Sequence, residues 1–182
     1  MPRKICSMGR LGAYKVDLKG QENPEASYQW TIDSDFFAAL DAEEVRNGHL
    51  SVNLTVTKEK GEYLLLFDIN GDAIVQCDRC LDDMSLPIET SGDLKVRLGA
   101  DFADDGDVVI VPEQEGTINV SWYIYEFIAL AIPLKHVHAP GKCNKEMTEQ
   151  LNRHLAPEPG DDEQNGPVDT RWDQLKDLNI ED

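Results

Sequence analysis

The chain has 182 residues, which is long enough for one domain with a hydrophobic core, with or without a tail. It carries 35 Asp and Glu residues against 17 Lys and Arg residues, so its formal net charge is -18. Proteins bind nucleic acids mainly by neutralising phosphates with Lys and Arg. The charge therefore argues against broad direct binding to RNA or DNA and favours docking onto a basic protein.

Two further properties narrow the class of protein. No apolar run reaches the length that a bilayer requires, because the most apolar stretch, residues 122–134, is interrupted by Glu126 and ended by Pro133. The four cysteines are too few and too unevenly spaced for a secreted disulfide scaffold. We therefore expect a cytoplasmic protein that does not enter a membrane.

The N-terminal part of the chain predicts two strands and a helix. Residues 14–18 alternate apolar and polar side chains and predict a strand, and residues 27–32 can pair with it in antiparallel. Ser34 is a predicted N-cap, because its hydroxyl oxygen can accept a hydrogen bond from the first turn. The helix should end at Asn47-Gly48, and its apolar side should consist of Phe36, Phe37, Leu40 and Val45.

The clearest strand pattern covers residues 50–57, where apolar and polar side chains alternate without interruption. Such a strand has one buried face and one face in water. Residues 58–61 should then turn the chain into an antiparallel strand over residues 63–69. The apolar members of the first strand are Leu50, Val52, Leu54 and Val56.

Two glycines, Gly71 and Gly92, are predicted to interrupt the strands that follow. Asn70-Gly71 predicts a hairpin turn, since both residues tolerate a positive φ, and residues 73–76 then lead directly into Cys77. After Cys80 a long strand should cover residues 84–98, with a break or bulge near Ser91-Gly92. Together these patterns predict a meander of antiparallel strands with the two cysteines at a strand end.

The chain then predicts short strands followed by two helices. Residues 108–111 and 117–120 have strand composition, and Ser121 should cap a helix that runs to about Ala131. Pro133 ends that helix. Residues 144–155 predict a further helix. The apolar residues at helical spacing in the first of these helices are Trp122, Tyr125, Ile128, Ala129 and Ile132.

The last part of the chain, residues 157–182, predicts an acidic linker that ends in a short amphipathic motif. The linker is rich in Pro, Gly, Asp and Glu and cannot bury enough apolar surface to fold. The motif contains Arg171, Trp172 and Leu175, which we expect to bind a partner. The alternative that Trp172 folds back onto the chain's own sheet stays open.

Cys77-Asp78-Arg79-Cys80 is the strongest candidate site. Two cysteines with two residues between them can hold a metal or form a disulfide. A closed zinc site needs four ligands, and the other cluster of soft ligands is residues 136–143. The predicted ligands are Cys77, Cys80, His138 and Cys143, with His136 taken as exposed and not a ligand. A metal-free thiol pair and redox chemistry remain alternatives.

Catalysis requires a nucleophile with an adjacent base, or a metal with an open coordination position. The sequence offers no nucleophile elbow, HExxH motif, P-loop or GxGxxG motif. Thioredoxin-like chemistry requires its CxxC motif at a helix N-terminus, whereas a predicted strand precedes Cys77. We therefore expect no catalytic residues. An enzyme would still be compatible with the sequence if three protein ligands held zinc and water took the fourth position.

Four elements occur in a characteristic order: Cys77-Asp78-Arg79-Cys80-Leu81, Leu130-Ala131-Ile132-Pro133-Leu134, His138 with Cys143, and Asp169-Thr170-Arg171-Trp172-Asp173-Gln174-Leu175. In this combination the chain resembles the bacterial large ribosomal RNA subunit accumulation protein family, YceD. The resemblance covers most of the chain. It implies a cytoplasmic, non-catalytic factor that is needed for normal accumulation of large-subunit ribosomal RNA.

The chain departs from that family at one point. Many members carry a second cysteine-rich cluster after the Leu-Pro-Leu segment, whereas this chain has His138 and a single Cys143. These two residues could replace a second cysteine pair in a Cys₃His site. Zinc is therefore the cofactor that the site would take.

The sequence as a whole predicts an α+β fold, with an antiparallel sheet that can curl towards a barrel and a few packed helices. The predicted domain covers residues 1–156 and the acidic tail residues 157–182. The predicted function is a non-enzymatic factor in ribosome assembly, with ribosomal proteins or a pre-ribosomal particle as partners. The alternatives are a metal-dependent or thiol-redox enzyme that uses the Cys/His cluster, and a general acidic adaptor.

Overall fold

The computed structural model describes residues 11–155, apart from residues 22, 43, 105 and 107. The chain divides into two units, Met1–Asn144 and Lys145–Asp182. The predicted partner-binding residues Arg171, Trp172 and Leu175 lie outside the described residues, as does the predicted linker. The boundary between a domain at 1–156 and a tail at 157–182 therefore stays a prediction.

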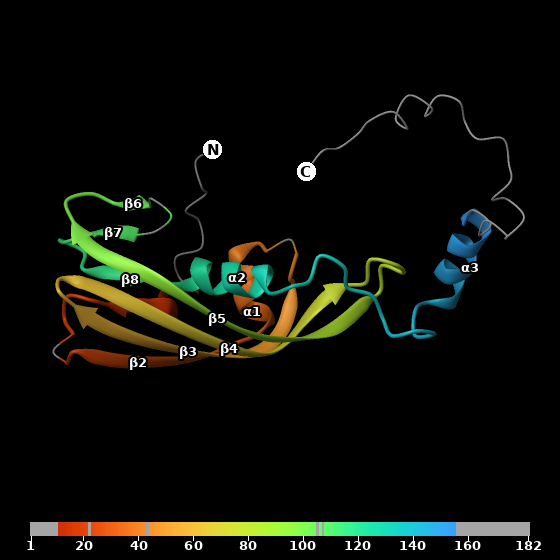
Figure 1. The fold of residues 1–182 in the computed structure, drawn as a ribbon, viewed down its shortest axis with the longest axis horizontal. Coiled ribbons are helices and arrows are strands. Elements are labelled where there is room, and N and C mark those ends of the chain that lie inside the picture. The colour runs from red at the N-terminus through yellow and green to blue at the C-terminus, as the bar shows by residue number, and fades with distance from the viewer. Residues whose placement is uncertain (1–10, 22, 43, 105, 107, 156–182) are drawn as a thin grey trace, which may run out of the picture. The chain divides into compact units, whose positions relative to one another are not determined.

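Six strands form one twisted sheet in the described part of the first unit, in the order β2-β3-β4-β5-β7-β6 (Figure 1). Strands β2 to β5 follow one another as an antiparallel meander, and β7 joins β5 in parallel. The predicted antiparallel α+β fold is confirmed. Among the described strands the sheet stays open, with β2 and β6 at its edges, and it does not close into a barrel. The strands are β2 (Glu25–Ile32), β3 (Asn47–Glu59), β4 (Glu62–Gln76), β5 (Asp83–Gly99), β6 (Ala103–Asp104) and β7 (Val108–Pro112).

Strand β3 shows why the sheet has one buried face. Its apolar residues, Leu50, Val52, Leu54 and Val56, are all buried, as their alternation predicts. Each such side chain contributes about 1.5–3 kcal/mol when it leaves water, and a register slip of one residue would expose all of them. The predicted turn after β3 is confirmed at Lys60 and Gly61, whose φ angles are 48° and 92°.

Helices α1 (Ser34–Leu40) and α2 (Ser121–Leu130) lie on the same face of the sheet (Figure 1). A two-stranded sheet of β1 (Lys15–Asp17) and β8 (Thr117–Asn119) completes the same core, together with the 3-10 helix η1 (Leu11–Tyr14). The largest fully buried side chains of the core outside β3 are Phe37, Phe67, Leu18, Ile32, Leu65, Ile69, Ile124 and Ile128.

The predicted pairing of residues 14–18 with residues 27–32 is wrong. Strand β2 pairs over its whole length with β3, from Glu25 opposite Thr57 to Ile32 opposite Leu50. Strand β1 pairs instead with β8, through three residue pairs. The longer ladder satisfies more backbone groups of β2 than a hairpin with the short β1 could, so the residues between β1 and β2 connect two separate sheets.

Both helices near the core begin one residue earlier than predicted. In α1 the cap is Asp33, whose carboxylate accepts hydrogen bonds from the backbone N–H groups of Asp35 at 3.0 Å and Phe36 at 3.4 Å. Asp41, whose backbone is left-handed, ends α1. Val45 is buried, but it lies after the helix and not on its apolar side. Asn47 already belongs to β3. Ser121 is the first residue of α2 and not its cap.

The predicted hairpin turn at Asn70-Gly71 is also wrong, because β4 continues through it and pairs with β3 and β5 on both sides. Gly71 has a φ of 149°, and a Cβ atom there would lie 2.3 Å from the carbonyl oxygen of His49. The glycine therefore permits two backbones to approach closely within the sheet.

The break predicted near Ser91-Gly92 is absent from β5, which pairs with β4 without interruption. A Cβ atom on Gly92 would lie 2.3 Å from the ring of Phe127 in α2. This glycine therefore makes room for a helix side chain above the sheet.

In the second unit the predicted helix at residues 144–155 is confirmed as α3 (Lys145–His154). It carries Glu146 in its first turn and Arg153 in its last turn. This order of charges complements the helix dipole.

Replacing Gly71 with Ala should lower the free energy of unfolding by about 2 kcal/mol, because the new methyl group meets backbone atoms of β3 that cannot rotate away. Urea denaturation of the purified protein measures the change. Gly12→Ala is the matched control, since a Cβ atom there would meet no heavy atom within 4 Å apart from those of the adjacent residues. Equal stability of the two variants would contradict this role of Gly71.

Candidate metal centre

The turn between β4 and β5 carries the first two candidate ligands. Strand β4 ends at Gln76, and Cys77 follows it directly. The backbone N–H of Cys77 donates to the carbonyl of Asp82 at 2.9 Å, and the N–H of Leu81 donates to the carbonyl of Cys77 at 2.9 Å. Leu81 has a φ of 62°, in the left-handed region. These bonds close the turn so that both Cys77 and Cys80 are buried.

The other two candidate ligands lie in the chain between α2 and α3, and Asp78 holds this loop against the turn. The N–H of His136 donates to Oδ2 of Asp78 at 2.8 Å, and the N–H of Asp78 donates to the carbonyl of His136 at 3.0 Å. The ring of His136 lies 3.6 Å from the other carboxylate oxygen of Asp78 and 3.1 Å from the carbonyl of Pro133. The prediction that His136 is exposed is wrong, because its side chain is only about one-fifth exposed. It lies outside the set of four candidate ligands and contacts the turn instead.

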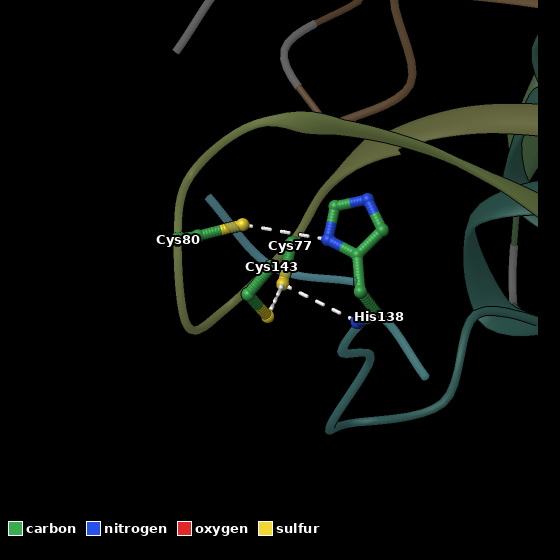
Figure 2. Close-up of side chains that lie close together, drawn as sticks. All are labelled: Cys77, Cys80, His138 and Cys143. Atoms are coloured by element: carbon green, nitrogen blue, oxygen red, sulfur yellow. Dashed lines mark hydrogen bonds between the residues drawn. The ribbon is translucent and has the colours of Figure 1, made fainter. Parts of the chain in front are cut away.

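The four predicted ligands come together although they are distant in the sequence (Figure 2). The sulfur of Cys77 lies 3.9 Å from that of Cys143, and the sulfur of Cys80 lies 3.4 Å from Nδ1 of His138. All four candidate ligand atoms lie within 4.8 Å of one another. Cys77, Cys80, His138 and Cys143 could therefore hold a metal ion.

A disulfide does not account for this arrangement. Its two sulfur atoms are bonded at about 2.05 Å, whereas those of Cys77 and Cys143 are 3.9 Å apart, and Cys80 is also a free thiol. The backbone N–H of His138 donates to the sulfur of Cys77 at 3.4 Å. Such a hydrogen bond favours the thiolate, which is the form that binds metals.

The pKa values of the Cys77 and Cys143 thiols are shifted in opposite directions. Burial acts to raise the pKa of Cys77, but hydrogen bonds from the backbone N–H groups of His138, Cys80 and Arg79 outweigh it and lower that pKa to about 6. Burial raises the pKa of Cys143 to about 11, and hydrogen bonding to Cys80 and Cys77 acts in the same direction. Hydrogen bonds to Cys77 and Cys80 raise the pKa of His138. A bound cation would displace the protons that these groups retain.

Sequence reasoning missed Asp78 and His136 as the residues that join the two loops. Both lie inside or beside the predicted motifs, but their mutual hydrogen bonds link positions 58 residues apart. The available signal was weak, because an Asp that follows a cysteine in a turn most often faces water. Its role depends on where the second loop lies, which local sequence does not specify.

The fold and the site together define a class of protein: an open, mostly antiparallel α+β sheet with a Cys₃His cluster at one end of its longest hairpin. No helix among the described residues is long and apolar enough to cross a membrane.

Residues 65–179, more than half of the chain, match the family described as Large ribosomal RNA subunit accumulation protein YceD. The chain belongs to this family, and the matched range includes all four cluster residues. No curated protein and no solved structure gives a significant match.

Asp78→Ala should lower the free energy of unfolding by about 1–3 kcal/mol, because the N–H of His136 loses its carboxylate acceptor. Chemical denaturation monitored by circular dichroism measures this change. Arg79→Ala is the matched control, because it alters the neighbouring exposed side chain of the same turn and should change stability by less than about 0.5 kcal/mol. If the two variants are equally stable, the carboxylate does not hold the loops together.

Proposed function

We propose that Cys77, Cys80, His138 and Cys143 bind one structural zinc ion. Thiolate and imidazole ligands are those that zinc prefers, in tetrahedral geometry. Zn–S bonds of about 2.3 Å place two sulfur ligands about 3.8 Å apart. The 3.9 Å separation of the Cys77 and Cys143 sulfurs supports the proposal. Four protein ligands would leave no position for an activated water molecule.

The zinc would join two segments that the sheet alone does not hold together. One segment is the β4–β5 turn, and the other is the loop after α2, whose residues 133–142 are mostly exposed. An exposed loop buries little apolar surface that could stabilise it. In zinc-finger peptides the binding of structural zinc contributes about 10–16 kcal/mol, far more than the few hydrogen bonds between these segments.

We further propose that the protein is a non-enzymatic, cytoplasmic factor that supports accumulation of large-subunit ribosomal RNA and ribosome assembly. The observation that carries this proposal is the match of residues 65–179 to a family whose description names the accumulation of the large ribosomal RNA subunit. The net charge of -18 argues that the contacts are made to ribosomal proteins within a pre-ribosomal particle more than to naked RNA. The terminal residues Arg171, Trp172 and Leu175 are proposed to contribute to docking on that particle.

Deletion of the gene in the source bacterium should lower the ratio of large-subunit to small-subunit ribosomal RNA, measured by quantitative electrophoresis of total RNA. Plasmid-borne wild-type protein should restore the ratio. Cys80→Ser should fail to restore it if the metal centre is needed for a folded factor, because one ligand is lost. Cys6→Ser, which leaves the four ligands intact, is the matched control. An unchanged ratio in the deletion strain would contradict the proposed function.

A further inference from the structure

A groove with a volume of about 890 Å³ lies beside the metal centre. One wall comes from the end of β4 and the turn after it, with Ile74 and Leu81. The other comes from the end of α2 and the following loop, with Leu130 and Leu134. Figure 1 shows the chain leaving α2 beside the ends of β4 and β5. Of the four candidate ligands, Cys77 alone contributes to the described lining of this groove.

The groove exposes three large apolar side chains to solvent. Leu81 is 60% exposed, Leu130 is 81% exposed and Leu134 is fully exposed. Single exposed leucines are common, but several that line one groove indicate a surface that another molecule covers. Leu81 is held there by a left-handed backbone, which is costly for a residue with a Cβ atom. The turn thus maintains an exposed apolar side chain at a conformational cost.

Three of the four Asp, Glu, Lys and Arg residues that line the groove are acidic. Glu44, Asp78 and Asp83 line the groove and are exposed. Arg46 is the one Lys or Arg among its described lining residues. Apolar walls with these three acidic side chains beside them, here called the acidic rim, are complementary to a segment that presents apolar side chains between positive charges.

We propose that this groove is a docking site for a basic segment of a protein partner, with apolar anchor residues separated by Lys or Arg. The inference rests on the proposed function, since it specifies how a basic ribosomal protein would be held. The zinc would fix the shape of the groove, because the ligand-bearing turn and the ligand-bearing loop form its opposite walls. The acidic rim would speed encounter and select the partner by charge.

Charge favours a basic segment over three other possible occupants of the groove: the chain's own terminal segment, a second copy of the chain, and RNA. Residues 157–182 of the chain contain nine acidic residues against two basic ones, so the acidic rim would repel the chain's own terminal segment. A second copy of the chain carries the same net charge of -18. RNA presents phosphates, which the rim would also repel. A basic peptide segment is the occupant for which both the apolar and the charged parts of the groove are favourable.

The test uses the full-length, zinc-loaded protein and a short fluorescent peptide in which Leu and Lys residues form an amphipathic helix. Fluorescence anisotropy should show binding that weakens with added salt. Leu134→Ser should weaken binding by about tenfold, as the loss of a central anchor does. Phe102→Ser is the matched control, because Phe102 is 62% exposed and does not line the groove. Thermal denaturation should confirm that both variants remain folded, which is expected for exposed side chains.

Three results would overturn the inference. Equal binding of a peptide with Glu in place of Lys would remove the role of the rim, and equal weakening by Phe102→Ser would remove the groove. Nuclear Overhauser contacts between Trp172 and Leu134 in the free protein would show that the terminal segment occupies it. None of these results involves ribosomal RNA. The groove can therefore fail while the RNA ratio still supports the proposed function, and the reverse also holds.

Discussion

The arrangement of the candidate metal centre depends on the convergence of two loops that are far apart in the sequence. Cys77 meets Cys143 across 66 residues, and Cys80 meets His138 across 58. Three thiols and an imidazole within 4.8 Å of one another make an unfavourable cluster unless a cation or protons balance the thiolates. Zinc would relieve that cost and tie the loops together. The hydrogen bonds between Asp78 and His136 hold the second loop against the turn without using any of the four ligands.

The sheet positions the first of these loops, because its longest hairpin, β4–β5, ends in the turn that carries Cys77 and Cys80. Strands β4 and β5 pair without interruption from Glu62 opposite Arg97 to Gln76 opposite Asp83. Gly71 permits the close approach of β3 to β4, and Gly92 permits Phe127 of α2 to pack above the sheet. The position of α2 then determines where the loop after it begins. Packing in the core therefore positions both the hairpin and the loop, and these two segments carry the four residues of the Cys/His cluster.

Local patterns in the sequence predicted the parts of the fold that local physics decides. The alternation from Leu50 to Val56 specified β3, and the types and spacing of the cysteine and histidine residues specified the four candidate ligands. Asn70-Gly71 misled because a glycine that permits close packing has the same local signature as a glycine in a turn. The pairing of β1 with β8 and the Asp78–His136 bonds depend on long-range geometry, which no local pattern contains. The groove was missed for the same reason, since its leucines come from separate elements.

X-ray absorption spectroscopy at the zinc edge tests the central claim most directly, when it is combined with metal analysis of protein purified under reducing conditions. The account predicts about one zinc per chain, with three sulfur ligands at about 2.3 Å and one nitrogen ligand at about 2.0 Å. Cys143→Ser should replace one sulfur in that shell by a lighter atom or lose the metal. A metal-free protein, or a wild-type shell that contains an oxygen ligand from water, would contradict a closed structural site.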